Sequence, residues 1–411
     1  MSDFTKNIIS VFNGALLAQL IPIIGSVFIL RIYSPTTFGE YSSWLAIVMI
    51  VAVLLTLRLE DALSIVGDGL LRVKSVLYIS VVCVCLAILG SLLLSLTSKW
   101  FAFDFFRNSY ELFFLIIPAA LLIAMNSLWQ IWAATEGLYR KLNIMRITQG
   151  SILILSQAVI GLGGATTTRL AIGLLVASII SFSICLFIMP RICYTGAFEI
   201  DEFLEFFKRY RNFLVYGLPS GLVNIVAAQL PVILVAKEFG SEVAGYLALT
   251  IRVLGAPMGL VGGAVLNVFR REAAQSFERI GNCRSLYLRV LIMLSAASVV
   301  FVVCTIFFSR IIFQTFYGLA WIESGAMAVW LIPLFAMRFV ASPLSYVVYI
   351  VEKQHVDLLW QILLLLVTYV TLVSASSYKI AILSYSIGYA FLYCIYLYIS
   401  YQLSLGKESR I

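Results

Sequence analysis

Long apolar runs alternate with short polar segments along the whole chain. A transmembrane helix needs about 20 mainly apolar residues, and about twelve runs in this sequence approach or exceed that length. They lie at approximately 10–30, 43–59, 76–97, 112–134, 149–165, 170–190, 213–236, 245–267, 286–308, 325–350, 357–374 and 380–402. The polar segments between them are too short to form a soluble domain. The pattern predicts an all-α integral membrane protein with about twelve transmembrane helices.

A short polar pattern occurs twice, each time between two apolar runs. The first copy is Leu30–Gly39, and the second, Ala236–Gly245, follows about half a chain length later. Both contain a cation, an aromatic residue, a small polar residue and a glycine in the same order. Such a repeat predicts two similar halves in parallel duplication, because six helices return the chain to the same side of the membrane. We therefore expect an N-terminal six-helix lobe at 1–190, a cytoplasmic linker helix at 191–212 and a C-terminal six-helix lobe at 213–411.

The linker carries acidic residues first and basic residues last, an order that suits the dipole of a helix. Phe203, Phe206, Phe207 and Tyr210 recur at helical spacing, as expected for a helix lying on the inner membrane surface. This helix is either a tether between the two halves or a docking site for a regulator.

Composition and charge set the orientation. Because 62% of the residues are hydrophobic and 12% charged, the chain is not an ordinary soluble globule. If the N-terminus is cytoplasmic, most of the 28 Lys and Arg residues, including Arg58, Arg72 and Arg146, fall on the inner side. We therefore predict that both termini are cytoplasmic. The net charge of +8 adds attraction to anionic membrane lipids, and its spread over several loops argues against a nucleic-acid partner.

Several kinds of chemistry are not expected. The cysteines lie in predicted helices or inner loops, where disulfides do not form, and there is a single histidine, His355. The sequence has no phosphate-binding glycine loop, no nucleophile motif and no paired metal ligands. We expect neither an enzyme nor a metal ion or cofactor.

Two arginines lie within predicted helices eight and ten. Arg252 precedes Gly255, Pro257 and several further glycines, and Arg338 lies between Pro333 and Pro343. A charge inside the membrane is costly unless it faces water, a partner or a ligand. Each arginine is therefore either paired within the bundle or directed at an anion in a hydrated cavity.

The end of predicted helix two carries both signs of charge. Arg58 and Asp61 are three residues apart and can pair on one helical face. The functional alternative is that Glu60 or Asp61 binds H⁺ or Na⁺ and couples it to a conformational change. In helix eight, Gly259 and Gly263 have the spacing of a close helix–helix contact.

Amide side chains recur within the predicted helices. Because an amide offers both donors and an acceptor, it can bind sugar hydroxyls or join two helices. Those considered are Gln19, Asn126, Asn224 and Gln229.

Several segments match the landmarks of one known family. They are Arg31–Tyr41 for its first outer loop, Arg58–Glu60 for its Arg-aromatic-Glu signature, Tyr216–Gly221 for the start of helix seven, Ala244–Pro257 for helix eight, and Phe316–Trp321 and Ser342–Ser345 for the flanks of helix ten. On these segments the chain resembles the bacterial polysaccharide transporters, the O-antigen and lipid-linked oligosaccharide flippases of the multidrug/oligosaccharidyl-lipid/polysaccharide (MOP) superfamily. It departs from the family at Leu59, which replaces the usual aromatic residue, and at Asp61, which adds an acid.

The resemblance implies a V-shaped bundle of two lobes that open alternately to each side of the bacterial inner membrane. Its cargo would be an oligosaccharide on an undecaprenyl pyrophosphate carrier, with Arg252 and Arg338 on the diphosphate. Weaker candidates for glycan contacts are Asn13, Gln19, Asn126, Asn224 and Gln229. Hinge positions would be Pro22, Pro219, Pro257, Pro333 and Pro343. The polymerase and chain-length machinery of the same pathway are candidate partners.

Three other membrane proteins are considered. A polysaccharide polymerase usually has a large outer loop, and the longest outer segment here, 98–111, is short. A drug or cation antiporter of the MATE type shares the superfamily fold but favours buried carboxylates over deep arginines. A lipid II flippase has a similar cationic cavity and usually two additional helices.

Overall fold

The computed structural model describes residues 20–67, 69–97, 110–188 and 199–406. Within these residues the chain is helical and has no β-strand. Eleven helices are long and apolar enough to cross a membrane, and they correspond to predicted runs two to twelve. Predicted run one is seen only from Leu20, where a shorter apolar helix, Leu20–Ile32, begins. The all-α membrane architecture is therefore confirmed.

Contacts within the chain divide it into two compact units, unit 1 (Met1–Gln229) and unit 2 (Leu230–Ile411). This boundary lies inside helix α8, Leu218–Phe239, and not in the predicted linker at 191–212. The six-plus-six division of the helices, with lobe boundaries at 190 and 213, stays a prediction.

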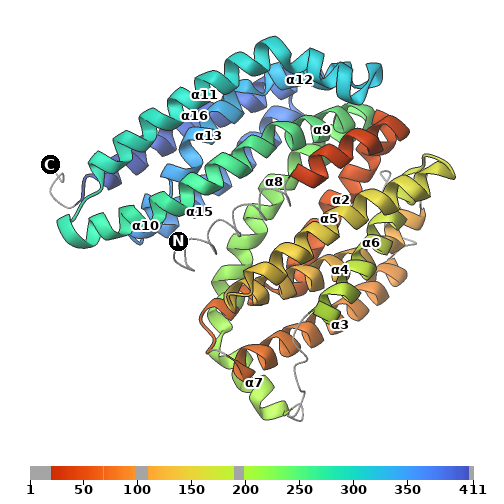
Figure 1. Ribbon diagram of the computed structural model, residues 1–411, viewed down its shortest axis with the longest axis vertical. Helices are drawn as coiled ribbons and strands as arrows, with labels where there is room; N and C mark the ends of the chain where they lie inside the picture. The colour runs from red at the N-terminus through yellow and green to blue at the C-terminus, as the bar shows by residue number, and fades with distance from the viewer. Residues whose placement is uncertain (1–19, 68, 98–109, 189–198, 407–411) are drawn as a thin grey trace. The chain divides into compact units, whose positions relative to one another are not determined.

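In unit 1, helix α4 is central and packs against α2, α3, α5 and α6 (Figure 1). Trp44 of α2 is fully buried, and its indole Nε1 donates to the Leu112 carbonyl of α4 over 2.8 Å. The elements that follow the first helix are α2 Pro35–Thr56, η1 Leu59–Ser64, α3 Leu70–Thr97, α4 Tyr110–Thr135, α5 Tyr139–Leu162, α6 Thr167–Ile188, α7 Ile200–Arg209, η3 Phe213–Gly217 and α8.

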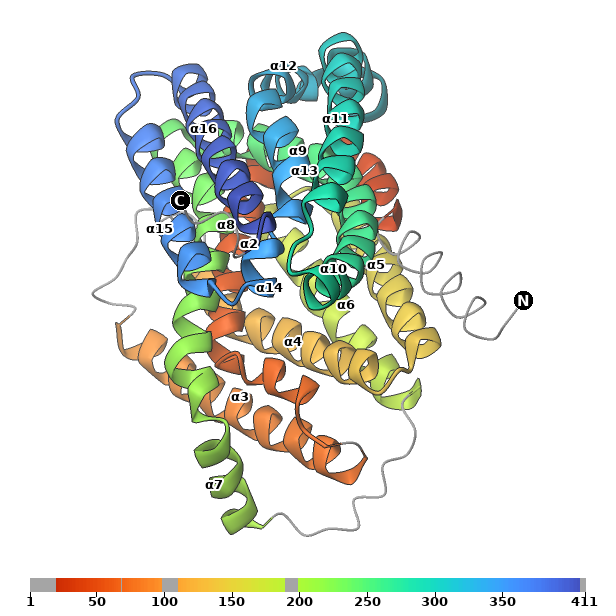
Figure 2. The same ribbon diagram turned by 90° about the vertical axis from the view of Figure 1, so that its left-hand side faces the viewer.

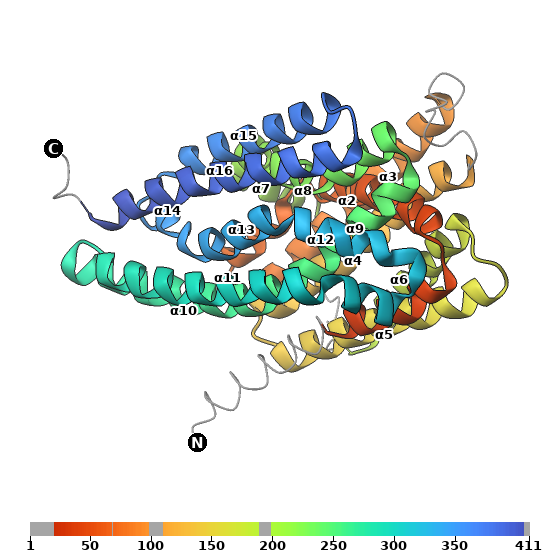
Figure 3. The same cartoon turned by 90° about the horizontal axis from the view of Figure 1, so that it is seen from above.

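In unit 2, α13 packs between α11 and α16, and α15 lies along α16 (Figures 1 and 3). Buried hydroxyls join these helices: Tyr287 of α11 bonds to Ser400 of α16 over 2.8 Å. The elements are α9 Ser241–Pro257, η4 Met258–Gly262, α10 Gly263–Ile280, α11 Arg284–Ile312, η5 Phe313–Tyr317, η6 Leu319–Trp321, α12 Ile322–Trp330, α13 Ile332–Leu344, α14 Val347–Ile350, α15 Gln354–Val373 and α16 Tyr378–Ser404.

The two copies of the repeated pattern occupy the same place in the helix order. In the first copy the helix ends at Ile32 and α2 begins at Pro35, with the Ser34 hydroxyl capping the Thr37 N–H over 3.2 Å. In the second copy α8 ends at Phe239 and α9 begins at Ser241. Gly240 joins them at φ +91°, a conformation that favours glycine. Both segments are therefore tight breaks between consecutive helices.

Within unit 1, helix α7 lies beside the start of α3 (Figure 2). Glu202 accepts a bond from Lys74 Nζ over 2.5 Å and another from the Tyr78 hydroxyl over 2.9 Å. The Phe203 and Phe206 rings pack on the Tyr78 ring. Ile200–Arg209 of the predicted linker is thus helical, and Phe203 and Phe206 of its aromatic stripe pack on α3. The extent of the linker and its cytoplasmic location stay predictions.

The outward faces of the helices are apolar, as a lipid environment requires. Leu96 of α3, Phe187 of α6 and Phe307 of α11 are 72%, 95% and 68% exposed. Such side chains are stable only where hydrocarbon replaces water around them. The exposed apolar side chains and the composition therefore both indicate that the protein lies in a membrane.

Candidate functional site

A groove of about 400 Å³ lies in unit 2 between the continuous helix α9–η4–α10 and α13. Its lining includes four glycines from the long helix, Gly255, Gly259, Gly262 and Gly263, and the Arg338 side chain of α13. The glycines give the groove its floor, because they remove side chains from the face of the long helix that points toward α13.

Gly255, Gly262 and Gly263 border open space and do not form a close helix contact. A Cβ atom built on Gly255 or Gly263 meets no heavy atom within 4 Å, and one on Gly262 first meets Pro343 at 4.0 Å. The sequence interpretation of Gly259 and Gly263 as a close-packing pair is therefore wrong at Gly263. The missing side chains leave open volume in the groove.

Gly263→Leu is expected to reduce transport while the protein stays folded. The larger side chain enters the groove, where a Cβ atom at this position meets no heavy atom within 4 Å, and leucine is about 1 kcal/mol better than glycine in a helix. The comparison variant is Gly325→Ala, whose Cβ would lie 2.9 Å from Arg310 Cα and should lower the melting temperature. Normal transport by Gly263→Leu would show that the groove does not carry the ligand.

Prolines lie at the helix irregularities around this groove. Pro257 ends α9, and the wider π-type turn of η4 follows at once. Pro333 is the second residue of α13, which begins after a break at Leu331, and Pro343 stands one residue before α13 ends. A proline lacks the N–H of a regular turn and its ring crowds the preceding turn, so the chain widens or breaks there. The Ser386 hydroxyl accepts the freed Leu334 N–H over 3.1 Å.

The other two predicted hinges differ from each other. Pro219 is the second residue of α8, which directly follows the π-type segment η3. Pro22 lies within the regular helix Leu20–Ile32, beside Gly150 of α5. Predicted run ten, 325–350, is accordingly not one helix but three pieces, α12, α13 and α14. Hinge motion at these prolines stays a prediction.

Arg338 is exposed on α13 and lines the groove. Among the described residues, no carboxylate forms an ion pair with it. Of the two hypotheses for this arginine, the internal ion pair is not found in the described part of the chain, and the contact with an anion stays a prediction.

Arg252 is exposed on α9 and lies outside the groove lining. It is three residues before Gly255, so the two lie on the same face of α9. The structure therefore places both arginines in unit 2, with Arg338 inside the groove and Arg252 on the continuation of its glycine face.

The amides fall into three groups. Asn126 is 3% exposed, and its Nδ2 donates to the Leu122 and Ser178 carbonyls over 2.9 and 3.1 Å. It joins α4 to α6 and cannot reach a glycan, which corrects its assignment. Asn224 is exposed and Gln229 half-buried on α8, so both stay candidates. Asn13 and Gln19 lie outside the described residues.

A cation inside helix α5 was missed by the sequence interpretation. Arg146 was assigned to an inner loop because the apolar run of helix five begins near 149, but α5 begins at Tyr139. The exposed Arg146 donates from Nε to Gln130 Oε1 over 3.4 Å, and Gln130 Nε2 donates to Gln149 Oε1 over 2.7 Å. The helical spacing of Asn143, Arg146 and Gln149 was the available signal.

A second charged cluster lies in unit 1, where α2 gives way to η1. The helix ends at Thr56, and Leu57 and Arg58 have φ values of +52° and +57°, a strained conformation for residues other than glycine. Arg58 Nη2 lies 3.1 Å from Asp61 Oδ2. The predicted Arg58–Asp61 pair is confirmed, although it spans a break and a 3₁₀ turn and not the end of a regular helix.

Glu60 is the buried member of this cluster. Its residue is 7% exposed, and Oε1 lies 4.0 Å from Arg58 Nη1. Within the described chain, Glu60 Oε2 and Arg58 Nε have no hydrogen-bond partner. Burial raises the pKa of the Glu60 carboxyl above its ordinary value. Gly221 of α8 packs on Arg58, since a Cβ there would lie 2.7 Å from Nε.

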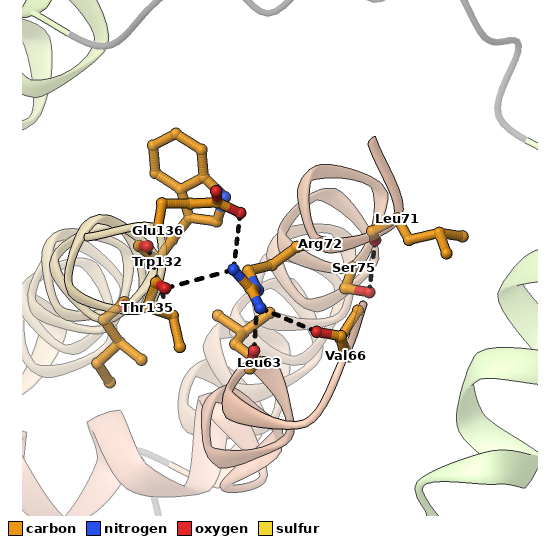
Figure 4. Close-up of polar contacts among 9 residues, drawn as sticks. Leu63, Val66, Leu71, Arg72, Ser75, Trp132, Thr135 and Glu136 are labelled. Carbon is orange, nitrogen blue, oxygen red and sulfur yellow. Dashed lines mark hydrogen bonds and ion pairs between the residues drawn. The ribbon is translucent and has the colours of Figure 1, made fainter. Parts of the chain in front are cut away.

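Arg72 of α3 fixes the segment that carries this cluster (Figure 4). The guanidinium donates to the Leu63 and Val66 carbonyls over 3.0 Å each and to Glu136 Oε1 over 2.9 Å. A longer bond of 3.4 Å reaches the Thr135 carbonyl. Arg72 is 5% exposed, and it joins the end of η1 to the end of α4.

Comparison with known proteins gives a family and a fold. Residues 28–326 match the model of a family described as polysaccharide biosynthesis protein. A search of curated proteins found no match.

Solved structures that resemble the chain are transporters. The lipid II flippase MurJ in an inward closed conformation has a TM-score of 0.70 at 14% identity, covering 98% of this chain and 90% of that one. An inward-facing multidrug resistance transporter of the MATE family and MOP superfamily has a TM-score of 0.67 at 12% identity, covering 98% and 96%. The MATE multidrug transporter DinF-BH has a TM-score of 0.66 at 13% identity, covering 97% and 95%.

At these identities the solved structures establish the fold, whereas the family match covers most of the sequence. The resemblance to polysaccharide transporters that was drawn from short segments is confirmed. This chain belongs to the polysaccharide biosynthesis protein family, and it has the fold of the MOP superfamily transporters.

Proposed function

We propose that this protein is a flippase for oligosaccharide repeat units of O-antigen or a related surface polysaccharide, each linked to undecaprenyl pyrophosphate. It moves them from the cytoplasmic to the periplasmic leaflet of the bacterial inner membrane by alternating access. The family match supports a role in polysaccharide biosynthesis, and the similarity to MurJ and MATE structures supports transport over catalysis.

The observation that carries this proposal is Arg338 in the glycine-lined groove. A guanidinium within a membrane-spanning helix costs several kcal/mol unless a counter-charge or water meets it. With no carboxylate paired to it among the described residues, the diphosphate of the carrier supplies that charge. A planar guanidinium offers two parallel N–H donors to phosphate oxygens.

The rest of the groove suits the neighbouring parts of such a cargo. Gly255, Gly259 and Gly263 expose backbone and free volume to the first sugar, while the prenyl chain stays in the lipid. Arg252, on the same helical face, is a second contact for the anionic group as the cargo moves. Asn224 and Gln229 on α8 are candidate contacts for sugar hydroxyls.

Glu60 is the better candidate for ion coupling. A buried carboxyl with a raised pKa takes up and releases a proton closer to neutral pH than an exposed one. Asp61, at 42% side-chain exposure, is instead held in its ion pair with Arg58. Protonation of Glu60 would remove one of the two negative charges that face Arg58. Because Gly221 of α8 packs on Arg58, this change would act directly on α8. Collapse of the proton gradient should slow net transport, and unchanged rates would favour an uncoupled facilitator.

Glu60→Gln is expected to flatten the dependence of stability on pH. Because the folded-state pKa is raised, the folded protein binds this proton more tightly than the unfolded chain. The stability it contributes is complete below the ordinary pKa of 4.5 and is lost as pH rises through the folded pKa. With rising pH, the melting temperature should therefore fall less in Glu60→Gln than in the wild-type protein. Equal slopes in Glu60→Gln and wild type would remove Glu60 as a proton site.

Deletion of the gene tests the function itself through the surface glycan profile of the host. Loss of the glycan, with single lipid-linked repeat units retained on the cytoplasmic leaflet, would support translocation. Surface glycan one repeat long would point to a polymerase, and an unchanged profile with a change in drug tolerance would point to a MATE-type antiporter. We also propose that the cytoplasmic side carries both termini, the linker helix and its basic residues. On that side the protein would contact membrane lipids and the polymerase and chain-length partners of the pathway.

A further inference from the structure

A second and larger cavity lies in unit 2, where α10 passes α14. Its volume is about 900 Å³, and its polar lining includes Asn267, Arg270, Arg271, Gln275, Tyr346 and Tyr349. Glu278 is the single acidic residue among the lining residues, so the cavity carries a net positive charge. Neither the family match nor the proposed role of Arg338 assigns a function to it.

The aromatic wall of this cavity is held in place. The Tyr346 and Tyr349 rings stack at 5.6 Å between centroids, and the Arg270 guanidinium lies 5.2 Å from the Tyr346 centroid. The Tyr349 hydroxyl donates to Asp357 Oδ2 over 2.8 Å. Stacking on Tyr346 orients the plane of Arg270 without using its N–H donors. Arg270 therefore keeps donors for an anion, and Arg271 beside it adds a second set.

The cavity continues the groove that contains Arg338. Along the long helix, Gly259, Gly263, Asn267 and Arg270 follow at intervals of three or four residues, and they line one cavity after the other. On the facing side, Arg338, Ser342, Tyr346 and Tyr349 do the same. Arg338 and Ser342 lie on α13, whereas Tyr346 and Tyr349 follow in the turn and in α14 after α13 ends at Leu344. Two cationic positions thus follow each other along the long helix and the α13–α14 segment.

We propose that this cavity is a second binding site for the phosphate group of a lipid-linked molecule. It receives the diphosphate of the cargo before the group reaches Arg338. The identity of the cargo rests on the proposed function, whereas the phosphate chemistry rests on Arg270 and Arg271. Amide donors from Asn267 and Gln275 and the tyrosine wall suit the sugar next to the phosphate.

The test is a count of bound lipids by native mass spectrometry on the full-length protein from neutral phosphatidylcholine nanodiscs. The probe is undecaprenyl pyrophosphate, and in a parallel series phosphatidylglycerol. The variants are Arg270→Gln/Arg271→Gln, Arg338→Gln and Arg279→Gln. Arg279 is an exposed arginine of α10 that does not line the cavity, so its variant removes a charge from the same helix.

Two molecules of undecaprenyl pyrophosphate are expected on the wild-type protein and on Arg279→Gln. One should remain on the double variant and one on Arg338→Gln, each loss corresponding to a roughly 10- to 150-fold weaker site. Two molecules on the double variant would overturn this inference and leave the role of Arg338 intact. An equal loss of bound lipid in Arg279→Gln would also overturn this inference, because binding would then depend on non-specific positive charge.

The parallel series separates the two sources of phosphate. Binding of phosphatidylglycerol but not undecaprenyl pyrophosphate, lost in the double variant, would keep the phosphate site and refute the proposed cargo. Binding of neither lipid would overturn both. A double variant with Lys at both positions should retain binding, because the charge is kept and only the planar donor set is lost.

Discussion

Replacing Arg338 with alanine is expected to abolish transport while the protein reaches the membrane at normal levels. The exposed guanidinium contributes no ion pair among the described residues, so its removal leaves no buried carboxylate unpaired. Losing one charge-assisted hydrogen bond to the diphosphate weakens binding roughly 10- to 150-fold, and a bidentate contact loses more. The measurement is the surface glycan of a deletion strain that carries the variant, with the membrane level of the protein determined in parallel.

Two further variants make this prediction specific. Arg338→Lys keeps the charge without the planar donor pair and should restore part of the activity. Arg289 of α11 is also an exposed arginine of unit 2 and lies outside the groove lining. Arg289→Ala should therefore transport normally. Full activity of Arg338→Ala, or equal loss in Arg289→Ala, would contradict a diphosphate site at Arg338.

Arg72→Met is expected to have the largest effect on stability. The substitution leaves the Leu63 and Val66 carbonyls without their donor and removes the ion pair to Glu136. Breaking a buried ion pair from one side costs about 3–5 kcal/mol, and the lower value applies because the Glu136 side chain is 21% exposed. The melting temperature of the solubilised protein should fall clearly, and the segment of η1 that carries Glu60 should become accessible to proteolysis.

Arg140 provides the matched comparison in the same unit. It is exposed at the start of α5, so Arg140→Ala should change stability by no more than about 0.5 kcal/mol. Glu136→Gln keeps a hydrogen-bond acceptor for Arg72, so its melting temperature should lie between those of Arg72→Met and Arg140→Ala. A melting temperature unchanged in Arg72→Met would show that this buried guanidinium does not hold η1 to α4.

The positions of the helices followed from the sequence, but their ends did not. Apolar runs mark only the stretch that lipid requires, whereas a helix continues as long as its backbone hydrogen bonds persist. Helix α2 therefore begins at Pro35, ahead of the apolar run, because Ser34 caps it. Helix α10 continues to Ile280 through polar residues, since Phe269 and Ala273 still pack in the core.

The candidate site was predictable to a similar extent. Proline chemistry indicated the irregular places at Pro257, Pro333 and Pro343, and the cost of a membrane charge singled out Arg338. The face to which an amide points depends on tertiary packing, so Asn126 was misassigned. Arg146 was missed because the predicted helix began too late.

The most direct test of the central claim is the leaflet distribution of undecaprenyl-pyrophosphate-linked repeat units in membrane vesicles of defined orientation. Wild-type protein should move the units to the periplasmic leaflet, and Arg338→Gln, present at the same level, should leave them on the cytoplasmic leaflet. Equal movement by the two proteins would contradict an arginine-based diphosphate site. No movement by the wild-type protein, in vesicles where another flippase moves the same units, would contradict the proposed function.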